Sequence, residues 1–208
     1  MKTSINERGN MINIKLQGGG YEVECEWCEK NQVNVRTEAD GESVSICMTC
    51  YNQMISEELG VDLIDHEDKV YLKDDKGVIR EFSIQQKIDP VGIFIVAEEK
   101  SEFGYSFSVF GELDVDQHAL FRKLIAKVKN GISTSYVEER EFPNGELYQA
   151  LKDGSFTGQI EAGETLGDPV IIIDGKPYTW HEVGRMLDTY EGFQLKVKTY
   201  EPTQDAGE

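Results

Sequence analysis

The chain of 208 residues is long enough for one large domain or for two to three small ones, and its 39% of hydrophobic residues argues against a wholly disordered chain. With 39 acidic and 21 basic residues, the net charge of −18 argues against binding to duplex nucleic acid or to an anionic membrane, because both need a clustered basic face. No apolar run approaches membrane-spanning length and the N-terminus has no secretory signal pattern, so we expect a cytoplasmic protein.

The first 20 residues are predicted to form a tail and one short strand. Residues 11–16 alternate apolar and polar side chains as a strand does, whereas residues 1–10 are expected to be a loose tail. Gly18, Gly19 and Gly20 favour a flexible joint. We therefore place the first boundary after residue 20.

All four cysteines lie in one window of 26 residues, as two C-x-x-C pairs. Cys25 and Cys28 form the first pair, and Cys47 and Cys50 form the second. In a cytoplasmic chain such pairs are typical of a tetrahedral zinc site rather than of disulfides, and the thioredoxin-like βαβ setting of a redox pair is absent. Because four thiolates leave no open position for a substrate, the sequence predicts one structural Zn²⁺ and no catalytic metal.

The residues between the two pairs predict how the pairs meet. Residues 33–37 and 43–46 alternate like strands, and Asp40-Gly41 between them is a hairpin turn signal. A hairpin would therefore fold the second cysteine pair back onto the first.

A helix is predicted directly after the second pair. Residues 51–59 have helical spacing, with Gly60 as the stop. Cys50 would then lie at a helix N-terminus, where the helix dipole favours a thiolate. A knuckle, a hairpin and a helix in this order predict a treble-clef zinc finger over residues 21–60.

Residues 25–59 resemble the N-terminal zinc-binding domain of the ClpX protein unfoldase. The likeness rests on the 18-residue spacing between the pairs, on Trp27 before the second cysteine, on the Ser-Val-x-Ile-Cys strand and on the polar helix start. In that family the domain dimerises and binds adaptors and substrates, so the resemblance implies a protein partner or self-association. No G-x-x-x-x-G-K-[ST] loop follows, so it does not extend to the ATPase. The remainder has only a general likeness to uncharacterised bacterial proteins, which implies no activity.

Residues 61–135 are predicted to form a sheet covered by one helix. Strands are expected over residues 69–73, 78–84, 91–97 and 105–110, with a hairpin turn at residues 74–77. Helical spacing follows, from an N-cap at Asp116 to a stop at Asn130-Gly131. Strands followed by one long helix are typical of an α+β layer.

Residues 136–208 are predicted to close the chain with a smaller α+β unit. Its first part, residues 136–168, is expected to be irregular, with a short helix near residues 147–151. A strand–helix–strand unit should follow, made of a buried strand at 170–173, a turn at 174–177, a helix opened by a Thr179–Glu182 capping box, and a last strand at 193–197.

The histidines do not indicate a catalytic site. His66, His118 and His181 lie far apart in the sequence, and each is interpreted as a surface residue. Asp114 and Asp116, beside His118, offer oxygen ligands, although N-capping explains Asp116 without a metal. The chain has no G-x-S-x-G, no H-E-x-x-H and no Rossmann glycine pattern.

The sequence as a whole predicts an α+β protein of four parts: a tail and strand (1–20), the zinc finger (21–60), a central α+β domain (61–135) and a C-terminal α+β unit (136–208). The leading hypothesis is a non-enzymatic protein-interaction or adaptor module with structural zinc. Two alternatives stay open: a hydrolase-like enzyme with its site between the central and C-terminal layers, and a nucleic-acid-related protein or acidic DNA mimic.

Overall fold

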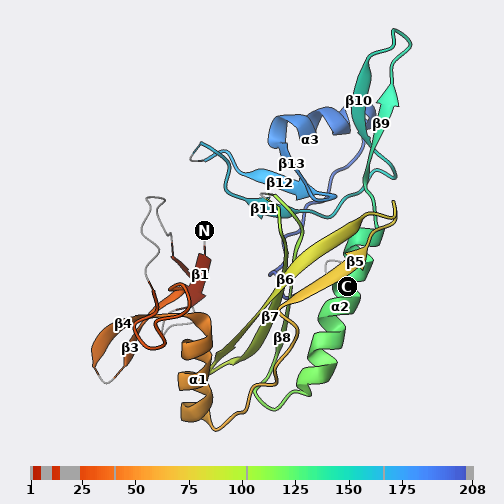
Figure 1. The fold of residues 1–208 in the computed structure, drawn as a ribbon. Coiled ribbons are helices and arrows are strands. Elements are labelled where there is room, and N and C mark those ends of the chain that lie inside the picture. Colours follow the sequence, from red (N-terminus) through yellow and green to blue (C-terminus); the bar gives the residue numbers. More distant parts are fainter. Residues whose placement is uncertain are drawn as a thin grey trace. The chain divides into compact units, whose positions relative to one another are not determined.

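The computed structural model describes residues 2–5, 11–14, 24–39, 41–101, 103–165 and 167–204. Helices and antiparallel sheets confirm the predicted α+β class (Figure 1). The chain divides into two compact units, Met1–Met54 and Ile55–Glu208, and the boundary falls inside the first helix. Among the described residues, no helix is long and apolar enough to cross a membrane.

The first unit opens with a pair of short strands. β1 (Lys2–Ile5) pairs antiparallel with β2 (Met11–Ile14). The strand expected at residues 11–16 is therefore present, but residues 2–5, which we expected in a loose tail, form a strand as well. The predicted glycine joint at residues 18–20 lies outside the described residues.

The hairpin predicted between the cysteine pairs is confirmed. β3 (Val35–Ala39) and β4 (Glu42–Ile46) pair antiparallel in a register that sets Val35 opposite Ile46. Helix α1 (Met48–Leu59) begins three residues earlier than the sequence predicts, so that Cys50 lies in its first turn. The chain leaves α1 through Gly60, whose φ of +65° is one that other residues rarely adopt.

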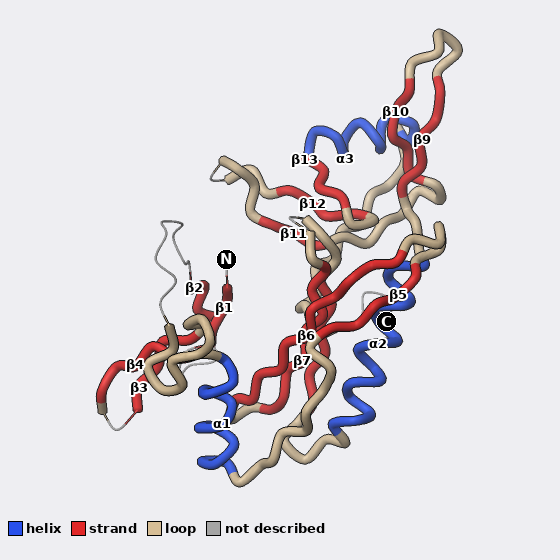
Figure 2. The backbone as a smooth tube through the Cα atoms, viewed as in Figure 1, coloured by secondary structure: helices blue, strands red, loops and turns tan. Residues whose placement is uncertain are grey.

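A four-stranded antiparallel sheet forms the centre of the second unit. Its strands follow chain order: β5 (Lys69–Lys73), β6 (Ile79–Asp89), β7 (Gly92–Glu99) and β8 (Ser106–Gly111). Helix α2 (Gln117–Ser133) runs along this sheet (Figure 2) and buries one stripe of side chains, Leu120, Leu124, Val128 and Ile132. The buried strand residues alternate as a half-covered sheet requires, with Ile93, Ile95 and Ala97 on β7.

Both ends of α2 can be compared with the prediction. Asp116 is the N-cap as expected, and its carboxylate accepts a hydrogen bond of 3.0 Å from the Ala119 N–H. The stop expected at Asn130-Gly131 is wrong, because the helix continues to Ser133. Gly131 is a contact residue instead: a Cβ atom placed on it would lie 2.3 Å from the Phe107 ring.

This contact gives a first testable prediction, because alanine normally stabilises a helix interior relative to glycine by about 0.5–1 kcal/mol. At Gly131 the clash with Phe107 should reverse the sign and cost about 1–3 kcal/mol of unfolding free energy. Gly184 in the last helix, α3 (Trp180–Leu187), is the matched control, since nothing lies within 4 Å of its added Cβ. Urea unfolding should therefore shift down for Gly131→Ala and slightly up for Gly184→Ala; a gain at both positions would contradict the packing described.

The region expected to be irregular contains a hairpin. β9 (Val137–Glu141) pairs antiparallel with β10 (Leu147–Leu151), so the short helix predicted near residues 147–151 is wrong. The physical reason is the turn between them, where Asn144 accepts from the Glu146 N–H and Gly145 has a φ of +87°. This Asn-Gly turn reverses the chain and gives β10 a partner strand.

A three-stranded sheet and a helix complete the second unit. β11 (Gln159–Glu161), β12 (Val170–Ile173) and β13 (Lys176–Thr179) are antiparallel in that order. Asp174 and Gly175 alone form the turn between β12 and β13, both with positive φ, so the turn is shorter than the predicted 174–177.

The capping box that opens the last helix is confirmed. The Thr179 hydroxyl accepts from the Glu182 N–H, and the Glu182 carboxylate accepts from the Thr179 N–H at 2.7 Å. Helix α3 (Trp180–Leu187) passes into the 3₁₀ turn η1 (Asp188–Tyr190). Residues 193–197 form no strand, so the expected strand–helix–strand unit is wrong in its last element.

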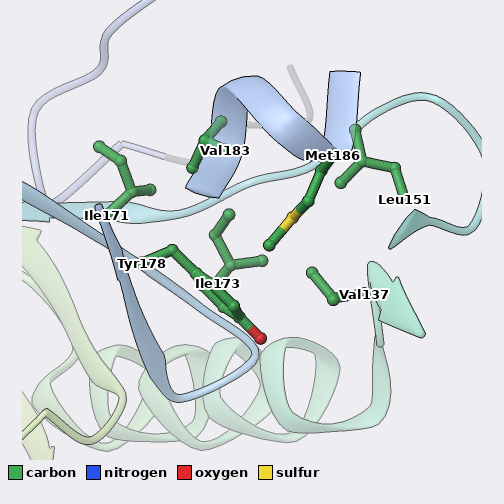
Figure 3. Close-up of a cluster of buried hydrophobic side chains, with 7 residues drawn as sticks. All are labelled: Val137, Leu151, Ile171, Ile173, Tyr178, Val183 and Met186. Atoms are coloured by element: carbon green, nitrogen blue, oxygen red, sulfur yellow. The ribbon is translucent and has the colours of Figure 1, made fainter. Parts of the chain in front are cut away.

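A small hydrophobic cluster joins α3 to this sheet and to the hairpin. Figure 3 shows Met186 and Val183 of α3 directed toward strand residues, and the cluster as a whole consists of Val137, Leu151, Ile171, Ile173, Tyr178, Val183 and Met186. These residues come from β9, β10, β12, β13 and α3, so the C-terminal elements share one core.

Candidate metal centre

The structure brings together the four cysteines that the sequence predicts as ligands. The Sγ atoms of Cys25, Cys28, Cys47 and Cys50 all lie within 4.8 Å of one another, and those of Cys28 and Cys47 are 3.8 Å apart. Cys25 and Cys47 are buried and the other two are half-buried, and none forms a disulfide. The four thiols therefore form one group that could hold a metal ion.

The first pair lies on a tight turn that backbone hydrogen bonds close. The Glu29 N–H donates to the Cys25 carbonyl at 2.9 Å, and Glu29 itself has a φ of +52°. The Cys25 N–H donates to the Asn31 carbonyl, and Glu24 pairs with Gln32 just outside. This turn directs both sulfurs to the same side, as a knuckle does in four-cysteine metal sites.

The second pair is positioned by the end of the hairpin and the start of α1. β4 ends at Ile46, Cys47 follows, and Cys50 lies in the first helical turn. The Glu26 N–H donates to the Ser45 carbonyl at 3.1 Å, which holds the first turn against β4. The hairpin therefore brings the two pairs together as the sequence predicts.

The surroundings act on the thiols in opposite directions. Burial by itself raises the pKa of the Cys25 thiol, but backbone N–H groups, that of Cys28 first, outweigh it and lower the pKa to about 6. The pKa of Cys47 is also lowered, against its burial, by the Cys50 N–H and the Asn31 amide. Burial and the neighbouring sulfurs raise the pKa of Cys50. The site thus favours the thiolate form of Cys25 and Cys47 and disfavours that of Cys50. The positive charge of a bound dication would stabilise the Cys50 thiolate as well.

The contact between Cys28 and Cys47 has the spacing of a zinc site. A Zn–S bond of about 2.3 Å in a tetrahedron requires sulfur atoms about 3.8 Å apart. The Cys28–Cys47 separation has this value, and a disulfide would need about 2.05 Å. Two N–H groups also point at the Cys47 sulfur, the Asn31 amide at 3.7 Å and the Cys50 backbone at 3.5 Å. Such outer contacts orient thiolate ligands and offset part of their charge.

Two of the three histidines lie close together although they are far apart in sequence. The His66 ring stacks on Phe121 with centroids 4.4 Å apart and lies 6.4 Å from the His118 ring. Burial, with His118 as a second cause, lowers the pKa of His66, and its buried Nε2 has no hydrogen-bond partner among the described residues. His66 is therefore half-buried against an aromatic ring rather than a surface residue, whereas His118 and His181 are exposed in the first turns of α2 and α3, as expected.

A half-buried polar cluster around Arg80 was not predicted from the sequence. The guanidinium of Arg80 pairs with Asp74 at 3.0 Å and with Glu99 at 2.8 Å, and lies 5.1 Å from the Tyr105 ring centroid. Burial, with the nearby Asp174 carboxylate, raises the pKa of Tyr105 to about 12. The Asp74 carboxylate also accepts the N–H of Val78, so the cluster closes the β5–β6 turn. Only the turn signal at residues 74–77 pointed to this place.

Three family models match the chain, each described as a domain of unknown function: DUF7685 over residues 24–62, DUF7686 over residues 65–133 and DUF7713 over residues 136–204. No curated protein and no solved structure matches it. The first match contains all four cysteines, the second the four-stranded sheet with α2, and the third the hairpin with the C-terminal sheet. None of these descriptions states an activity, so the function has to be argued from the site.

Proposed function

We propose that the cysteine cluster binds one structural Zn²⁺ and that the treble-clef finger it stabilises is a protein-docking module. Four thiolates would fill the tetrahedral coordination of the ion, so the metal would serve folding rather than catalysis. The order of turn, hairpin and helix and the likeness to the ClpX zinc-binding domain support this assignment.

The observation that carries the docking role is the position of Trp27. This residue lies between Cys25 and Cys28, in the turn that a bound metal would make rigid, and 46% of its side chain is exposed. Tryptophan is the residue type most often found at the energetic centre of protein interfaces, because a large rigid side chain buries much area for little lost entropy. A metal-fixed turn therefore presents an aromatic anchor to a partner.

The experiment compares two tryptophan variants of the full chain. Trp27→Ala removes the anchor, and Trp180→Ala removes a tryptophan of similar exposure (50%) from α3 in the other unit. Both should keep the wild-type metal content, because neither residue is a ligand. In a pull-down with the full chain as bait, wild type and Trp180→Ala should retain the same bound protein. The affinity of that protein for Trp27→Ala should be lower by at least about tenfold.

The two variants also show what would contradict the docking role. Equal capture of every bound protein by Trp27→Ala and by wild type would exclude this turn as the docking surface. The hydrolase-like and nucleic-acid alternatives stay hypotheses, since no observation on the described residues favours either.

A further inference from the structure

The segment after α3 has the sequence of a strand but no partner strand. In residues 193–200, which we call the C-terminal strap, Phe193, Leu195 and Val197 alternate with polar residues. The exposed fractions of these three side chains are 75%, 70% and 70%. Three large exposed apolar side chains at alternate positions of an irregular segment are a costly exposure, which a packed partner would remove.

The backbone of the strap is equally unpaired. From residue 194 to residue 200 it has no helix, strand or turn, and it makes no backbone hydrogen bond to any described residue. Its two ends are nevertheless held. The Phe193 N–H donates to the Tyr190 carbonyl at 2.9 Å, and beyond the strap the Lys127 ammonium donates to the carbonyls of Pro202 and Gln204. A segment fixed at both ends loses less entropy on pairing than a free tail would.

The same unit contains an open sheet edge that matches the strap. β11 pairs only with β12, so its other side is free among the described residues, and Ile160 at its centre is 55% exposed. The opposite edge strand, β13, contains Pro177, which has no N–H to offer a further strand. The polar–apolar–polar pattern of Gln159–Glu161 has the same period as the strap.

We propose that the C-terminal strap of one copy pairs with the β11 edge of a second copy, and that the exchange is reciprocal. Backbone hydrogen bonds would extend the three-stranded sheet, and the apolar strap residues would cover Ile160. A reciprocal exchange has two-fold symmetry and closes, so it gives a dimer rather than a filament.

Charge argues for a second copy as the occupant. Two chains of net charge −18 repel each other overall, but the strap itself contains two cations, Lys196 and Lys198, and no acidic residue. The β11 edge carries negative charge, from Glu161 on the strand and Glu164 just after it. The positive charge of the strap is therefore complementary to the negative charge at the β11 edge of a second copy.

Sedimentation of the full chain tests the proposal. Wild type should have twice the 23.5 kDa chain mass at micromolar concentration. Leu195→Asp on the strap and Ile160→Asp on the edge should each weaken the dimer at least about tenfold, because each puts a carboxylate into the new contact. Leu147→Asp, at a leucine with 58% exposure on β10, is the control and should leave the dimer intact. All three sites are exposed, so the fold should survive.

A mixing experiment distinguishes reciprocal exchange from other dimers. Leu195→Asp keeps an intact edge and Ile160→Asp keeps an intact strap, so an equal mixture should recover heterodimers through one of the two contacts. A monomeric wild type would overturn the proposal. This holds whether or not hydrogen exchange shows protected amides in the strap. A wild-type dimer that all three substitutions leave unchanged would overturn it equally.

Discussion

Replacing Cys47 with serine should release the metal and unfold the first unit, while the second unit keeps its fold. Cys47 is one of the two buried cysteines of the proposed ligand set, and its sulfur receives both outer N–H contacts. A serine hydroxyl at this position is a much poorer zinc ligand than a thiolate. We expect the metal content to fall and the amide protection of residues 24–50 to disappear in hydrogen exchange, with the protection of β6 and β7 unchanged.

The size of this effect follows from the small apolar core around the cysteines. In residues 24–39 and 41–54, the part of the unit whose side chains the structure describes, the buried apolar side chains apart from two cysteines are Val35, Ile46 and Tyr51. Three such side chains contribute less than about 10 kcal/mol. Ordering the window from Cys25 to Cys50 costs more than roughly 25 kcal/mol of backbone entropy. The apparent binding free energy of a structural zinc, about 10–16 kcal/mol, is therefore needed to fold it.

Thr49→Ser is the matched control for this substitution. Thr49 is exposed between the ligands of the second pair, so its change should leave both the metal content and the amide protection at wild-type values. A Cys47→Ser protein that keeps one tightly bound metal and a protected hairpin would show that the unit does not depend on four thiolates.

Leu124→Ala should produce a large loss of stability in the second unit. The side chain of Leu124 is fully buried on the face of α2 that covers the four-stranded sheet. Removing it leaves a cavity as well as losing transfer free energy, and such substitutions cost about 2–5 kcal/mol. Since a domain of this size has a total stability of about 5–15 kcal/mol, the urea midpoint should fall by a large fraction of its wild-type value.

The control makes the same chemical change on the surface. Leu147→Ala also shortens a leucine, but on an exposed part of the β9–β10 hairpin, and should cost less than about 1 kcal/mol. Equal losses for the two variants would mean that α2 does not provide the core of the sheet. Zinc removal should not change the Leu124→Ala effect, because this core belongs to the second unit.

Elements with a local chemical signal were predictable from the sequence. The β3–β4 hairpin followed from alternation around an Asp-Gly turn, and the start of α3 from the Thr179–Glu182 capping box. The grouping of the four cysteines was predictable for the same reason, since two short spacings and one hairpin determine where the sulfurs meet. In each case the residues that decide the structure lie within a few positions of one another.

Elements that depend on distant partners were not predictable. β9 is rich in glutamate, which has a low strand propensity, and its pairing with β10 overrides that preference. Residues 193–197 are the opposite case, because a strand pattern forms a strand only where a partner edge is present. The Arg80 cluster joins Asp74 and Glu99 from either side of β6, and no spacing in the sequence indicates this contact.

The most direct test of the account is the metal content and coordination of the full chain, purified without added metal. We predict one zinc per chain, and an X-ray absorption spectrum at the zinc edge that shows four sulfur neighbours at about 2.3 Å. Four freely titrating thiols with less than about half a zinc per chain would contradict the structural zinc, as would iron in its place or a shell containing oxygen or nitrogen.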